Sequence, residues 1–143
     1  MKKWLILFLM VFLTACGMSQ SVVKAGPFEI TQPMAMAAQT GGTTGAFMTI
    51  KNTGAEADRL IGASFAQAEM TQVHETVMEN DVMTMREVPA LEIPAGQALE
   101  LRHGSYHIML MGLTADLTPG ETVTVTLKFE KAGEIAVPLT VMK

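Results

Sequence analysis

The sequence predicts an all-β protein, a single-domain antiparallel β-sandwich or barrel, and three observations support this prediction. The chain has 143 residues, the length of about one domain, and 49% of them are hydrophobic, enough to build a core. Segments rich in Val, Ile, Thr, Phe and Met recur between Gly, Pro, Asn and Asp, which is typical of short strands joined by turns. Across residues 122–127, Val and Leu alternate with Thr, so one face of that segment is apolar. Many such segments at near-regular spacing favour a sandwich.

The N-terminus predicts a lipoprotein signal peptide over residues 1–15. Lys2 and Lys3 precede an apolar run that is about half as long as a bilayer-spanning helix needs to be. The run ends in Leu-Thr-Ala-Cys at 13–16, which resembles the lipobox of bacterial lipoproteins, whose cysteine becomes the lipid-modified first residue. We therefore expect lipidation at Cys16, a tether over residues 16–26, and an extracytoplasmic protein anchored to a membrane. The alternative is an ordinary signal peptide that is cut elsewhere, with Cys16 unmodified.

The folded domain is expected over residues 27–143, built from short strands. Turn signals at 94–96, 103–105 and 118–120 separate several of them. Residues 34–44 show no clear period and are expected to form a loop. The predicted strands are 28–32, 45–52, 59–66, 71–77, 82–88, 98–102, 106–112, 122–130 and 134–141.

Charge and cysteine content exclude several classes of function. Lys and Arg number 10 against 14 Asp and Glu, for a net charge of −4 and no basic stripe, so we expect no nucleic-acid binding. A single Cys excludes a disulfide framework and a Cys-rich metal site. The sequence holds no HExxH, no phosphate-binding Gly loop and no Ser-His-Asp order with supporting turn motifs, so we expect that the protein is not an enzyme. We also expect a monomer.

Methionine and histidine gather in two segments. The chain has 13 Met and 3 His. On a strand, His107 and Met109 share one face, while Ile108 and Leu110 share the other. A hairpin with its tip at residues 79–81 would bring His74 beside Met85 on adjacent strands. The third histidine lies at position 103, in a turn, and is expected to be exposed and not to bind a metal.

A set of imidazole and thioether donors points to Cu(I). Thioether sulfur is soft and neutral, zinc prefers Cys or more His, and calcium and magnesium need several oxygen ligands. Two alternatives remain open at this point. In the first, the Met residues only fill the core of a structural Ig-like surface lipoprotein that has no metal role. The second is a blue-copper electron-transfer protein, but such a site needs a Cys thiolate and the single Cys is Cys16 at the anchor.

The spacing of these residues resembles the periplasmic copper chaperone family called PCuAC, whose signature is H-x10-M-x21-H-x-M. The matching positions are His74, Met85, His107 and Met109. Further stretches that look like the family are 58–63, 73–75, 93–96 and 104–113.

The resemblance implies a cupredoxin-like β-sandwich or barrel that holds one Cu(I) near its surface through His74, Met85, His107 and Met109. It also implies that copper is handed to the CuA or CuB centres of respiratory oxidases, or handled in the periplasm. The partner would be a copper acceptor such as a cytochrome c oxidase subunit or an oxidase assembly factor. Where family members often carry an aromatic residue near the start of the domain, this chain has Met34 and Met36. Two interpretations of this pair stay open: both residues pack within a loop, or they form a hydrophobic or alternate-ligand lid over the copper.

Overall fold

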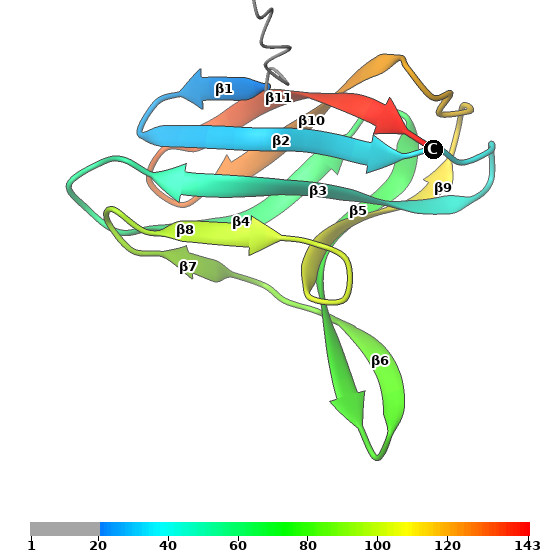
Figure 1. Cartoon of the computed structure of the whole chain (residues 1–143), viewed down its shortest axis with the longest axis horizontal. Helices are drawn as coiled ribbons and strands as arrows, with labels where there is room; N and C mark the ends of the chain where they lie inside the picture. The colour runs from blue at the N-terminus through cyan, green and yellow to red at the C-terminus, as the bar shows by residue number, and fades with distance from the viewer. Residues whose placement is uncertain (1–20) are drawn as a thin grey trace, which may run out of the picture.

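Eleven β-strands and no helix make up the part of the chain that the computed structural model describes, residues 21–143 (Figure 1). The predicted all-β class is therefore confirmed. The strands are β1 (Val22–Ala25), β2 (Phe28–Met36), β3 (Thr43–Asn52), β4 (Asp58–Phe65), β5 (Ala68–Glu79), β6 (Val82–Glu87), β7 (Leu91–Ile93), β8 (Ala98–Leu101), β9 (Tyr106–Leu113), β10 (Thr122–Phe129) and β11 (Gly133–Met142).

The strands form one hydrogen-bonded path that folds back on itself. Its order is β6-β5-β9-β3-β2-β11-β10-β4-β7, with β1 added to β2 and β8 added to β3. All pairs are antiparallel except β11 with β2. β4 and β5 lie near opposite ends of this path, yet only residues 66 and 67 separate them along the chain. The sheet must therefore curl until its two ends meet, which encloses a core between two layers.

Alternation along the strands supplies that core. In β11 the buried positions are Ile135, Val137, Leu139 and Val141, and every residue between them is exposed. The Phe28 and Phe129 rings stack inside with centroids 4.1 Å apart. Burying one such large apolar side chain contributes roughly 1.5–3 kcal/mol. This inward-facing row fixes which face of each strand looks outward.

The structure corrects two boundaries and adds one strand that the sequence did not predict, β7 at Leu91–Ile93, which pairs with β4. Residues 22–25, expected in the tether, form β1, because a turn with positive φ at Gly26 (57°) brings them back onto β2. Residues 34–36, expected in a loop, continue β2. Gln32 has a φ of 52° and the register shifts between Thr31 and Met34, so the alternation that marks a strand is interrupted there. The predicted signal peptide and Cys16 lie outside the described residues.

A hairpin of β5 and β6 projects from the body of the molecule (Figure 1). β6 pairs only with β5, and every residue of β6 is exposed. Asn80 and Asp81 have positive φ of 51° and 61°, the backbone that a two-residue hairpin turn requires. The turn thus lies within the predicted tip.

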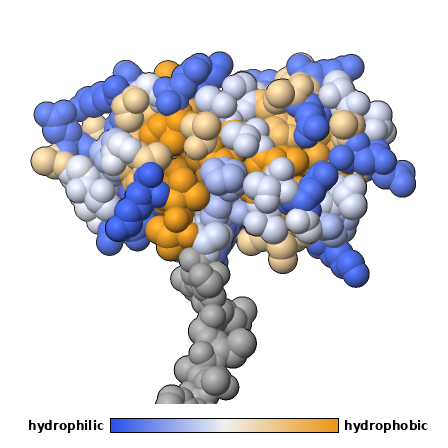
Figure 2. Space-filling view, turned by 90° about the horizontal axis from the view of Figure 1, so that it is seen from above, coloured by the Kyte–Doolittle hydropathy of each residue, from blue (hydrophilic) through white to orange (hydrophobic). Residues whose placement is uncertain are grey.

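The outer surface mixes charged and apolar side chains. Figure 2 shows, from above, apolar residues in the middle of this face and hydrophilic residues around its outline. Within residues 21–143, no helix combines the length and hydropathy that crossing a membrane requires.

One buried carboxylate ties the start of β4 to the turn between β10 and β11. Asp58 is 5% exposed and accepts backbone N–H bonds from Arg59, Lys131 and Ala132 at 2.7, 2.9 and 2.9 Å. Burial alone would raise the pKa of Asp58, but these three donors and the Lys131 charge together lower it below 3.8. The ionised carboxylate therefore stabilises this corner of the fold.

We predict that Asp58→Asn lowers the free energy of unfolding by about 2 kcal/mol at pH 7, because an amide oxygen replaces an ionised acceptor of three N–H groups. Because the folded-state pKa is lowered, this contribution is present above pH 3.8 and is lost as the pH falls through the folded-state value. Urea unfolding at several pH values measures both effects. The exposed neighbour Glu56, changed to Gln, serves as the control and should change stability by less than about 0.5 kcal/mol. Equal stability of Asp58→Asn and the parent at pH 7 would contradict the prediction.

Candidate metal centre

The candidate ligands lie on one face of three neighbouring strands, β6, β5 and β9. His74 on β5 lies directly opposite His107 on β9, and their ring centroids are 6.0 Å apart. Met109 lies opposite Gln72, two residues further along the same face. Ile108 and Leu110, between and beyond them on β9, are fully buried in the core. The predicted split of β9 into an apolar face and a His/Met face is confirmed.

Met85 reaches the same face from the projecting hairpin. It lies opposite Thr76, whereas His74 lies opposite Glu87. Met85 is therefore the diagonal neighbour of His74 rather than its direct partner, and diagonal neighbours remain within reach of long side chains. The structure thus places all four candidate residues on adjacent strands. Met85 lies two residues away from the position directly opposite His74.

Hydrogen bonds specify which nitrogen of each imidazole is free. His107 Nδ1 lies 2.9 Å from the Ser105 carbonyl oxygen, which can only accept, so Nδ1 carries the proton. His107 Nε2 is then left with a lone pair. Metal-binding histidines in proteins are commonly oriented in this way by a carbonyl or carboxylate on the other nitrogen.

His74 is oriented by a chain of two side chains. Gln72 Nε2 donates to Glu87 at 3.0 Å, so Gln72 Oε1 faces His74 Nε2 at 2.9 Å and accepts a hydrogen bond from its N–H. The lone pair of His74 therefore lies on Nδ1, which is buried and has no hydrogen-bond partner. Thr76 Oγ1, also on this face, is a second buried polar atom without a partner. Buried polar atoms are nearly always satisfied, so these orphaned atoms fit a site that takes a ligand.

The hollow beside these residues has a volume of about 240 Å³. His107, Met109 and Met85 line it, while His74 lies beside it through its contact with His107. The donor side chains that line this hollow include thioethers and imidazoles. No residue cluster of three or more His, Cys, Asp or Glu that suits a metal occurs in the described part of the chain. Its further lining is Met36, Thr44, Gly45, Phe47, Thr76, Met83, His103 and Gly104.

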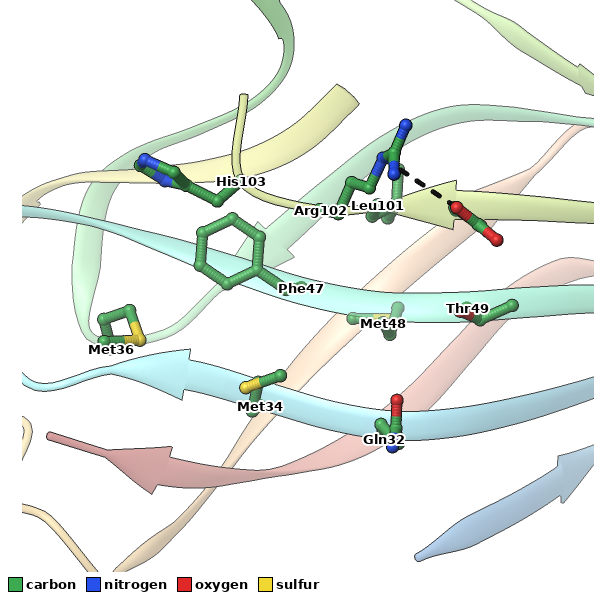
Figure 3. A pocket seen from close by; sticks show the side chains of 10 residues that line it. Gln32, Met34, Met36, Phe47, Met48, Thr49, Leu101, Arg102 and His103 are labelled. Carbon is green, nitrogen blue, oxygen red and sulfur yellow. Dashed lines mark ion pairs between the residues drawn. The ribbon is translucent and has the colours of Figure 1, made fainter. Parts of the chain in front are cut away.

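A larger cavity of about 700 Å³ adjoins the hollow and shares three of its lining residues, Met36, Phe47 and His103. Figure 3 shows the Phe47 ring between His103 and Met36, while Met34 lies further along β2. Met36 therefore borders the candidate centre, as a lid would, and Met34 lines only the neighbouring cavity. His103 is exposed, as expected, but it also lines the hollow, which the sequence did not indicate.

The residues that orient the imidazoles were missed at the sequence level. Gln72 is two residues from His74, and this strand spacing places both on one face, so a search for polar residues at that spacing would have found it. Glu87 comes from the neighbouring strand, and only the β5–β6 register brings it to Gln72.

The environment of His74 favours its neutral form. Partial burial and the facing His107 lower the pKa of His74 below 6.5, against the opposing effect of Glu87. A neutral imidazole at neutral pH is the form that can bind a metal.

We predict that NMR titration of the metal-free protein gives a pKa for His74 below 6.5, and that His107→Gln raises this pKa, because the electrostatic effect by which His107 lowers it is removed. Glu87→Gln should change the pKa in the opposite direction. Because the folded-state pKa is lowered, the protein loses stability as the pH falls below 6.5 and His74 takes up a proton. A His74 pKa that is unchanged in both variants would show that these groups do not act on it.

The comparisons with known proteins agree with the fold and supply the family. The class is that of PCuAC-like β-domains: the structure superimposes on a copper-bound PCuAC domain from PmoF2 with a TM-score of 0.71, at 24% identity over 85% of this chain and 97% of that one. The solution structure of CuI-DR1885 from Deinococcus radiodurans matches with a TM-score of 0.61, at 34% identity over 78% of this chain and 76% of that one.

A family model described as "Putative lipoprotein LpqE-like" matches residues 28–141, so the chain belongs to the LpqE-like family. A relative from Leifsonia xyli subsp. xyli (strain CTCB07), described as "Putative lipoprotein Lxx21020", is 43% identical over 119 residues, which are 81% of this chain and 71% of the relative.

Proposed function

We propose that this protein is an extracytoplasmic, lipid-anchored metallochaperone that binds one Cu(I) through His74, Met85, His107 and Met109. The observation that carries the proposal is the pair of imidazoles whose hydrogen bonds leave one nitrogen of each free beside a thioether-lined hollow. Two of the solved structures that it resembles are copper-bound. Soft neutral donors suit Cu(I) better than harder cations.

The donor set also suits a carrier. Four neutral ligands leave the single positive charge of Cu(I) uncompensated, so the ion is held without a thiolate and is open to exchange. Met85 is 54% exposed and lies on the projecting hairpin, so an incoming ligand can replace its weak thioether first. An acceptor with thiolate or imidazole ligands binds Cu(I) more tightly than this site does, so transfer of the ion to the acceptor is favourable.

The acceptor in this proposal is a copper centre of a respiratory oxidase, of the CuA or CuB type, or an oxidase assembly factor. A lipid anchor at Cys16 would hold the domain at the membrane surface, where such an acceptor is embedded. Membership of a lipoprotein family supports the anchor and an extracytoplasmic location. The protein has no catalytic role in this scheme, since it only exchanges ligands of the ion.

We predict that the full chain with Cys16→Ser takes up one tightly bound Cu(I) in an anaerobic titration against a chromophoric chelator. Met85→Leu with Met109→Leu should weaken this binding by about 100-fold, because two of the four donors are lost. Met70→Leu with Met142→Leu is the matched control, since it removes two exposed thioethers outside the hollow, and it should bind as the parent does.

Absence of tight binding in the parent, or equal binding by the parent and the Met85/Met109 variant, would contradict the proposal and favour a structural lipoprotein without a metal role. In the same assay, the loaded protein should transfer Cu(I) to an apo-CuA oxidase fragment. Net transfer from a loaded fragment to this protein would contradict delivery.

We further predict that Met36→Leu weakens Cu(I) binding several-fold, while Met34→Leu leaves it unchanged, because only Met36 lines the hollow. The two substitutions alter the same strand by the same chemical change, so each controls for the other. The chelator titration measures both. Equal affinities for the two variants and the parent would remove Met36 from the site.

A further inference from the structure

The tip of the projecting hairpin carries a pair of thioethers that does not contribute to the core. Met78 on β5 and Met83 on β6 lie directly opposite each other, and each is 65% exposed. An apolar side chain left in water gains none of the stabilisation that burial gives. Their place on the surface therefore needs an explanation other than packing.

The pair is continuous with the candidate metal centre. Met83 and Met85 are two residues apart on β6, so they point to the same face, and both line the hollow. Directly opposite side chains have Cβ atoms roughly 5 Å apart, close enough for both sulfur atoms to reach one ion. The thioethers of Met78, Met83 and Met85 thus form a row that leads from the tip of the hairpin to His107 and Met109.

The charges near the tip suit a cation. Glu79 precedes the turn and Asp81 lies within it, and both are exposed. The one cationic side chain of the hairpin strands, Arg86, is paired with Glu75 at 3.0 Å. The resulting negative potential raises the local concentration of a monovalent cation. Carboxylate oxygens are hard ligands, so they compete poorly with thioether sulfur for the soft Cu(I) ion.

We propose that Met78 and Met83 form a second, weaker Cu(I) site, an outer loading site that exchanges the ion with the inner site through Met85. This proposal rests on the proposed function, because the ion would pass from the outer site to the inner site of His74, Met85, His107 and Met109. At each step one thioether–copper bond breaks as another donor bond forms, and no proton or electron moves. The inner site offers four donors to Cu(I) and the outer site offers two, so the ion moves inward.

A second thioether pair supplies the matched control. Met70 and Met111 also lie directly opposite each other on the same face, at the other side of the two histidines. Neither of them lines the hollow, whereas Met83 does. Met70 is 52% exposed and Met111 is partly buried. If any two methionines directly opposite each other on this face bound Cu(I), this pair would do so as well.

The test is an anaerobic Cu(I) titration of the full Cys16→Ser chain labelled with methyl-¹³C methionine, followed by NMR. We expect the first equivalent to shift the methyl signals of Met85 and Met109, and a second equivalent to shift those of Met78 and Met83. Met78→Leu with Met83→Leu should lose the second equivalent and keep the first, with slower loading of the inner site. Met70→Leu with Met111→Leu should keep both equivalents.

Three outcomes would overturn the outer site: no second equivalent in the parent, its persistence in the Met78/Met83 variant, or its loss in the Met70/Met111 variant. Failure of the proposed function gives a different result from failure of the outer site. In that case the signals of Met85 and Met109 do not shift at the first equivalent, whether or not the signals of Met78 and Met83 shift. Both tip residues are exposed, so leucine at these positions leaves the fold intact, and the unshifted methyl signals of the core report on that directly.

Discussion

The register between β5 and β9 is the constraint on which the site depends. Val73 pairs with Ile108, and both are buried, so the core holds the two strands in this alignment. The same alignment places His74 opposite His107 on the outer face. A slip of one residue would move each side chain to the other face of the sheet and bury an imidazole among aliphatic groups. The energy that fixes the metal centre therefore comes from the hydrophobic core behind it.

The candidate centre joins two parts of the molecule that differ in packing. His107 and Met109 stand on β9, which has β5 on one side and β3 on the other. Met85 stands on β6, which is exposed along its whole length and pairs with β5 alone. Few buried contacts mean that the hairpin opens at a lower free-energy cost than the body. Met85 therefore stands on a strand that opens easily, whereas His107 stands on a strand that neighbours hold on both sides. This combination suits a site that must both retain an ion and release it.

The orientation of the two imidazoles shows how the sheet preorganises donors before any ion is bound. Ser105 fixes His107 through a backbone carbonyl, and Gln72 fixes His74 through a side chain that Glu87 orients in turn. Each contact leaves one ring nitrogen as the available donor. The free nitrogen is Nε2 in His107 but Nδ1 in His74. The two rings therefore present different nitrogens, although the two residues lie directly opposite each other on β5 and β9.

The sequence by itself determined the strand-rich class, the two faces of β9, the hairpin tip and the spacing of His74, Met85, His107 and Met109, because alternation and turn residues are local properties of the chain. It misplaced β1 and the end of β2, where a positive φ at Gly26 and at Gln32 alters the local pattern. Only the tertiary structure decided that Met85 lies diagonally from His74, that Gln72 and Glu87 orient an imidazole, and that Met36 and His103 border the hollow. These relations join residues from different strands, and strand register is set by the packing of the whole core rather than by any one segment.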